Sequence, residues 1–167
     1  MSGVTCLRPH RDFVLADCGD SAVRLTSLSP DVEERWQAVH TVAAALDARG
    51  DDAAVTGIIP TYDSLLVEFD CAATTHDAIR ALVERLIELP AQPATRGSRQ
   101  FEIPVVYGGE FGPDLDDVAA HLALAPAEVI RLHSARPLTM RCFGAPGGAP
   151  LLDGPAFPPP VPRPTIP

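Results

Sequence analysis

Apolar and polar residues alternate in two short runs within residues 12–28, on either side of a turn at residues 19–21. Apolar side chains at every second position are typical of a strand with one buried face, so this segment predicts two strands. The same alternation returns in residues 53–70 and is interrupted near Pro60. This second segment therefore predicts two more strands.

Two helices are predicted, one after each pair of strands. Ser29 is a favourable N-cap and Pro30 suits the first helical position, so the first helix is expected to begin there. A second helix is expected to begin at residues 74–75 and to stop at Pro90. The apolar stripe of the first helix follows a helical spacing and consists of Val32, Trp36, Val39, Ala43 and Leu46.

The order β-β-α-β-β-α over residues 1–90 predicts a small two-layer α+β domain with its helices on one face of the sheet. Residues 91–100 combine Pro, Ala, Thr, Gly, Ser and two Arg without an apolar period, which is typical of a linker. The remaining residues, 101–167, are expected to form a second domain.

The second domain is expected to open with a strand, because Phe101, Ile103 and Val105 alternate with polar residues or proline. Helices are predicted from about Pro113 and from Pro126, followed by at most one further strand, residues 138–143. Nine of the 18 prolines fall in the last 30 residues. A tail of this composition cannot complete a sheet by itself.

The charge of the chain narrows the classes of function. With 13 Lys+Arg against 22 Asp+Glu, the formal net charge of −9 argues against non-specific nucleic-acid binding. All 13 basic residues are Arg, so neither a P-loop lysine nor a Schiff-base lysine exists in this sequence.

The cysteines and the N-terminus predict a cytoplasmic location. No apolar stretch approaches the roughly 18 residues that span a bilayer, and the first residues lack the apolar segment of a signal peptide, so no membrane association is expected. The scattered cysteines form no CxxC pair and are expected to be reduced structural thiols rather than a metal site. They are Cys6, Cys18, Cys71 and Cys142.

The loop of residues 107–112 is the best candidate for a binding site. Glycines ahead of a helix expose backbone N–H groups, and the helix N-terminus adds a positive dipole end, so an anion is favoured there. Glu110 and Asp114 already occupy that positive field, so a bare phosphate would be repelled while a Mg²⁺-bound nucleotide would be tolerated. The alternative is a tight structural turn with acidic helix caps.

His133 is the candidate for proton transfer, because histidine is the usual general acid or base near neutral pH. Arg136 is close in sequence and is able to hold a carboxylate or phosphate with two hydrogen bonds. The alternative is a packed histidine beside the apolar helix residues Val129 and Ile130.

Four segments in this order resemble one bacterial family, named variously the B subunit of 5-oxoprolinase, KipI and allophanate hydrolase subunit 1. The segments are residues 19–22, 59–67, 103–115 and 129–135. The resemblance implies a small α+β domain followed by a cyclophilin-like β-barrel, and a larger carboxyltransferase-like partner subunit from a neighbouring gene.

The resemblance also implies a reaction, the ATP-dependent opening of 5-oxoproline or hydrolysis of a related amide. Under this hypothesis His133 and Glu110 are the catalytic residues, and Tyr107, Gly108, Gly109 and Arg136 bind substrate or nucleotide. ATP with Mg²⁺ is then shared with, or held by, the partner subunits, and no separate metal site is expected.

The sequence departs from the family after residue 143, where two expected aromatic residues are missing around the Pro-Gly core of residues 143–154. The strands that would close the barrel do not follow, so an incomplete barrel is expected. Two alternatives to the enzyme subunit stay open here. One is a KipI-like regulator that inhibits a sensor histidine kinase, and the other is a decayed paralogue without activity.

Overall fold

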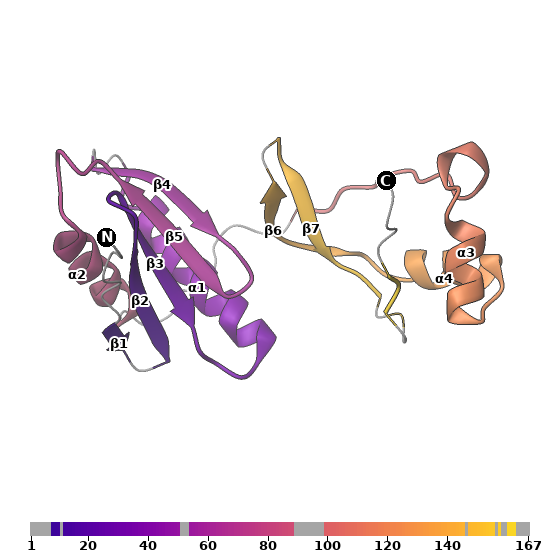
Figure 1. Cartoon of the computed structure of the whole chain (residues 1–167), viewed down its shortest axis with the longest axis horizontal. Helices are drawn as coiled ribbons and strands as arrows, with labels where there is room; N and C mark the ends of the chain where they lie inside the picture. The colour runs from indigo at the N-terminus through magenta and orange to yellow at the C-terminus, as the bar shows by residue number, and fades with distance from the viewer. Residues whose placement is uncertain are drawn as a thin grey trace. The chain divides into compact units, whose positions relative to one another are not determined.

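The computed structural model describes residues 8–10, 12–50, 54–88, 99–145, 147–155, 157 and 160–162 (Figure 1). The chain divides into two compact units. The N-terminal unit comprises Met1–Gly97 with Arg141–Ala149, and the C-terminal unit comprises Ser98–Met140 with Pro150–Pro167. Cys6, Pro90 and most of the predicted linker, residues 91–98, lie outside the described residues.

A five-stranded antiparallel sheet forms one layer of the N-terminal unit, in the order β1-β2-β3-β5-β4. Leu25 on β3 pairs with Leu15 on β2 and with Leu65 on β5, and all three side chains are fully buried. The alternation predicts β2 to β5 correctly and misses β1, which has only three residues. The strands are β1 (Arg8–His10), β2 (Phe13–Cys18), β3 (Ala22–Ser27), β4 (Val55–Pro60) and β5 (Ser64–Phe69).

Two helices, α1 (Val32–Asp47) and α2 (His76–Ile87), share one core with these strands and form the second layer (Figure 1). Helix α1 begins later than predicted, because Asp31 and not Ser29 is its N-cap. The Asp31 carboxylate accepts a 2.8 Å hydrogen bond from the Glu34 N–H, whereas the Ser29 hydroxyl donates to the Glu34 side chain. Thr75 caps α2 through the Ala78 N–H, which confirms the predicted start.

One cation, Arg80, is buried within the described part of the N-terminal unit, with 5% of its surface exposed. Its guanidinium on α2 donates to the carboxylate of Asp17 on β2 and, at 2.6 Å, to Asp77. Burial by itself lowers the pKa of Arg80, but the hydrogen bonds to the two carboxylates outweigh it and raise the pKa above its ordinary value. The buried charge is therefore paired with two carboxylates, and the contact with Asp17 ties α2 to the sheet.

A two-stranded hairpin follows, with β6 (Thr139–Ala145) paired to β7 (Ala149–Asp153). Strand β6 is attached to α1, since Trp36 Nε1 donates a 2.9 Å hydrogen bond to the Arg141 carbonyl. The Arg141 guanidinium lies 4.8 Å above the Trp36 ring and pairs with Glu33 at 2.7 Å. The prediction of at most one strand after residue 137 is wrong, because Gly147 and Gly148, both at positive φ, turn the chain into β7.

The described part of the C-terminal unit is mainly helical, with a short 3-10 helix η1 (Gly109–Phe111) ahead of α3 (Leu115–Leu122) and α4 (Pro126–Ser134). The two predicted helices are thus present. Ala119, Leu122 and Val129 are buried together, with Leu115 and Phe157 packed against them.

The predicted strand at residues 101–105 is wrong within the described structure, since this segment has no assigned secondary structure. Phe101 and Ile103 are 72% and 76% exposed. The alternation of apolar residues is present, but a strand also needs a neighbour for its backbone groups, and none of the described residues supplies one. The α+β fold class is therefore confirmed, while the described residues form no closed barrel.

None of the helices in the described ranges is both long and apolar enough to cross a bilayer.

Candidate functional site

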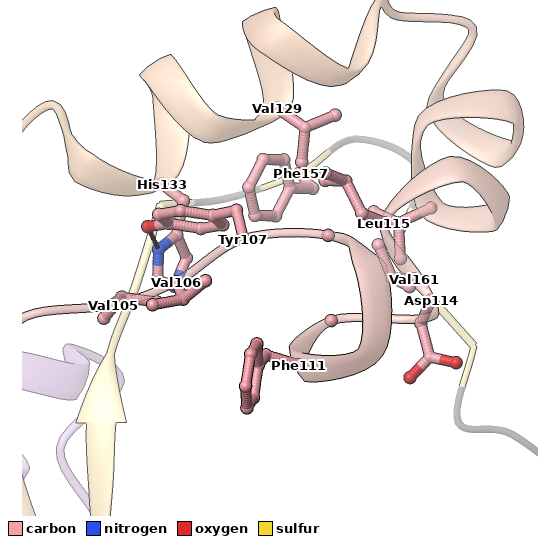
Figure 2. Close-up of a pocket in the computed structure, with 13 residues that line it drawn as sticks. Val105, Val106, Tyr107, Phe111, Asp114, Leu115, Val129, His133, Phe157 and Val161 are labelled. Carbon is pink, nitrogen blue, oxygen red and sulfur yellow. Dashed lines mark hydrogen bonds between the residues drawn. The ribbon is translucent and has the colours of Figure 1, made fainter.

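A hollow of about 430 Å³ lies in the C-terminal unit, between the segment before η1, helices α3 and α4, and the last described residues (Figure 2). Most of its wall is apolar, and its polar side chains are Asp114 and the pair Tyr107 and His133, which face each other. A hydrogen bond that faces an apolar hollow meets less competition from water than one on an open surface. The apolar wall includes Val105, Val106, Leu115, Val118, Val129 and Val161.

Tyr107 and His133 are joined by a hydrogen bond of 2.6 Å between the phenol oxygen and imidazole Nδ1, drawn as the dashed line in Figure 2. Their rings meet edge to face, with centroids 5.7 Å apart and an interplanar angle of 79°. Both residues are half-buried. The pair therefore has a fixed mutual geometry and one side open to the hollow.

The position of Tyr107 depends on the glycine loop that follows it. Gly108 adopts φ 76° and Gly109 φ 58°, which favour residues without a Cβ. A Cβ on Gly112 would lie 2.6 Å from the backbone nitrogen of Gly108, and the Gly112 N–H donates to the Gly108 carbonyl at 3.1 Å. Only glycine fits this closed turn, which holds the end of the Tyr107 segment against the hollow.

His133 is positioned by α4, where it lies four residues after the buried Val129 and so shares its helix face. Pro126 at the first helical position and Ala125 before it fix the start of the helix. Glu128 and Arg131 pair on the exposed side at 2.6 Å. The apolar stripe of α4 therefore places the imidazole in the wall of the hollow.

The other candidate residues occupy different places. Gly108 lines the hollow, whereas Gly109 and Glu110 do not. Arg136 follows α4, is exposed and also lies outside the lining. The structure thus brings Tyr107, Gly108 and His133 together.

Sequence reasoning did not assign the apolar residues of the lining to a site, and Phe157 and Val161 are the furthest in sequence from the candidate loop. Phe157 and Val161 belong to the proline-rich tail, where the only available signal is that large apolar residues flank a run of prolines. The tail is fixed to α3 by a hydrogen bond of 3.1 Å between His121 Nε2 and the Pro160 carbonyl.

The family model for the carboxyltransferase domain, subdomain C and D, matches residues 13–167. The chain belongs to this carboxyltransferase-domain family. It is 31% identical over 153 residues to the B subunit of 5-oxoprolinase from Bacillus subtilis (strain 168), covering 85% of this chain and 63% of that protein. It is 40% identical over 77 residues to the same subunit from Haemophilus influenzae, covering 45% of this chain and 36% of that protein.

Among solved structures, this family member is similar to TTHA0988, with a TM-score of 0.63 and 30% identity. The match covers 78% of this chain and 25% of that chain. The chain thus spans 63% of the Bacillus subtilis protein and a quarter of TTHA0988.

The side chains around the hollow of this carboxyltransferase-family chain do not match the needs of Mg²⁺ and ATP. Among the described residues of the lining, Asp114 is the one carboxylate and none is an Arg. Within the described ranges, no group of three or more His, Cys, Asp or Glu side chains is arranged to hold a metal ion. A triphosphate needs several cationic or metal contacts, so the hollow itself does not fit ATP.

Proposed function

We propose that the chain is a subunit of an ATP-dependent amidohydrolase that acts on 5-oxoproline or a related amide together with a larger partner subunit from a neighbouring gene. The observation that carries this proposal is the Tyr107–His133 pair in a mainly apolar hollow, in a chain that is 31% identical to the B subunit of a 5-oxoprolinase. 5-Oxoproline presents a lactam edge and a carboxylate, and the Tyr107–His133 pair supplies hydrogen-bonding groups for one of them in a compact hollow.

In this proposal His133 exchanges protons or hydrogen bonds with the amide, and Tyr107 orients the imidazole of His133. Gly108 lets the backbone approach the ligand, because it has no side chain. Glu110 and Arg136 are exposed and lie outside the lining, so we assign them, with Gly109, to the surface that meets the partner subunit.

ATP is assigned to the partner subunits, since the described residues around the hollow include no Arg that could hold phosphates. The N-terminal unit then serves as a scaffold. Three curated relatives share the name of a 5-oxoprolinase B subunit, which supports the enzyme subunit over a kinase regulator.

We also propose that the C-terminal unit belongs to a cyclophilin-like barrel, which the described residues do not close. Support comes from the high exposure of the alternating residues Phe101, Ile103 and Val105, which is 72%, 76% and 53%. Exposed apolar strands are usually paired or covered.

The test is co-expression of the chain with the product of the neighbouring gene, followed by addition of the third subunit and measurement of 5-oxoproline-dependent ATP hydrolysis. We expect activity only in the complete mixture. The His133→Ala variant is expected to lower the rate by about 10²-fold or more, which is typical of losing an acid–base group.

His76→Ala is the matched control, because His76 lies in the N-terminal unit and does not line the hollow. Its rate is expected to match that of the parent chain. If the Bacillus subtilis B subunit restores ATP hydrolysis with the same partners and this chain does not, the proposed function is wrong.

A further inference from the structure

The two ring nitrogens of His133 are in different surroundings. Nδ1 lies 2.6 Å from the Tyr107 phenol oxygen. Nε2 has no hydrogen-bond partner among the described residues, although His133 lines the hollow. Any ligand in the hollow that bonds to the imidazole therefore meets Nε2.

The Tyr107–His133 hydrogen bond permits two arrangements of the proton in the neutral pair. In one, the phenol donates to Nδ1, and the ring proton resides on Nε2; in the other, Nδ1–H donates to the phenol oxygen, and Nε2 is bare. A phenol is a stronger hydrogen-bond donor than a neutral imidazole N–H. A bare imidazole nitrogen is, conversely, a stronger acceptor than a phenol oxygen.

The surroundings hold the pair in this contact. The closed turn of Gly108 and Gly112 fixes the Tyr107 segment, and α4 fixes His133. Both side chains are half-buried beside Val105, Val106 and other apolar residues, so water competes weakly for the phenol proton. The stronger donor and the stronger acceptor are thus kept together.

We infer that Tyr107 is a positioning residue that fixes His133 as the Nε2–H tautomer, so that His133 presents a hydrogen-bond donor to an acceptor oxygen of the ligand, a carbonyl or a carboxylate. This inference adds the role of each ring nitrogen to the proposed function. The class of ligand that it names rests on that function. In the neutral resting state His133 binds or polarises such an oxygen, and it does not act as a base through Nε2.

The tautomer is measured directly by long-range ¹H–¹⁵N NMR of the ¹⁵N-labelled chain at about pH 8, where an imidazole is neutral. We expect the pattern of a protonated Nε2 and a bare Nδ1 for His133. Tyr107→Phe keeps the ring and removes the hydroxyl, and is expected to give a mixture of tautomers. A protonated Nδ1 in the parent chain, or a pattern that Tyr107→Phe leaves unchanged, overturns the inference.

Tyr62→Phe is the matched control, since Tyr62 and Tyr107 are the two tyrosines of the chain and Tyr62 lies in the N-terminal unit. It is expected to leave the His133 pattern as in the parent. The NMR measurement needs no partner and no activity, so it stands even if the reconstituted complex is inactive and the proposed function fails.

A second measurement uses the reconstituted complex with 5-oxoproline. The amide nitrogen of His133→Gln reaches roughly the place of Nε2, whereas that of His133→Asn reaches roughly the place of Nδ1. We expect His133→Gln to keep at least about tenfold more activity than His133→Asn, the effect of one retained hydrogen bond. A higher activity of His133→Asn contradicts the donor role.

Discussion

The two units of the chain differ most in how much apolar surface they bury. Among the described residues, the N-terminal unit has a core of fourteen buried side chains, whereas the C-terminal unit has a cluster of three. The N-terminal sheet is covered by two helices, while Phe101, Ile103 and Phe111 in the C-terminal unit are more than 70% exposed. The Tyr107–His133 pair nevertheless lies in the C-terminal unit.

The difference indicates that the two units have separate roles, one in stability and one in binding. Stability of a region follows from buried apolar contacts, so the N-terminal unit is expected to open only near global unfolding and the C-terminal unit at lower free energy. Exposed apolar residues beside the candidate site suit a surface that another polypeptide covers. The subunit proposal therefore agrees with the physical difference between the units.

The largest expected effect comes from breaking the N-terminal core at Leu25, which is fully buried at the centre of the sheet. Leu25→Ala is expected to lower the free energy of unfolding by about 2–5 kcal/mol, through lost burial and the cavity that remains. Urea unfolding followed by circular dichroism measures the change. Leu124→Ala, at a residue 36% exposed, is the control and should cost less than about 1 kcal/mol. Equal losses in both variants would show that the core is not centred on β3.

A smaller effect is expected from the C-terminal cluster, where Phe157 is partly buried against Ala119, Leu122 and Val129. Phe157→Ala is expected to cost about 1–2 kcal/mol, less than a fully buried Phe, and to act locally. Hydrogen exchange should become faster in α3 and α4 and stay unchanged in β2 to β5. Phe101→Ala removes the same ring from a site 72% exposed and serves as the control. Faster exchange in both units would contradict separate stabilities.

The sequence predicts the N-terminal fold well because each element there is paired within the unit. Strands β2 to β5 and both helices follow from periodicity, since the alternating faces meet one another in register. Strand β7 was missed because it is short and contains Pro150, and the turn that makes it depends on Gly147 and Gly148. Residues 101–105 have the alternation of a strand without a partner, and alternation alone carries no information about partners.

The sequence predicts single residues of the candidate site but not the contact between them. Tyr107 belongs to the glycine loop and His133 to a helix, and each stands out as a chemical group. Their hydrogen bond joins residues 26 positions apart and depends on how α4 packs against the loop segment. Phe157 and Val161 enter the site from a tail whose composition predicts no packing at all.

The smallest expected effect concerns His40, whose ring stacks on Trp36 at 4.4 Å beside Arg141 and the Thr61 backbone. Burial, and to a lesser degree the Arg141 charge, lower the pKa of His40 despite backbone hydrogen bonds that raise it. The native state therefore binds a proton less readily than the unfolded chain. The contribution of neutral His40 to the free energy of unfolding is complete above about pH 6.5. It is lost as the pH falls through the lowered pKa of His40, and the free energy of unfolding then changes by at most about 1.4 kcal/mol per pH unit.

Urea unfolding of the parent and of His40→Gln between about pH 7.5 and pH 5.5 isolates this effect from the carboxylates, which titrate lower. We expect the parent to lose more stability than His40→Gln over that range, because the variant cannot take up the proton. His121→Gln, at an exposed position, should follow the parent. Parallel curves for the parent and His40→Gln would mean that protonation of His40 is tolerated next to Arg141. The attachment of β6 to α1 through Trp36, whose ring lies beside His40, would then not depend on the protonation of His40.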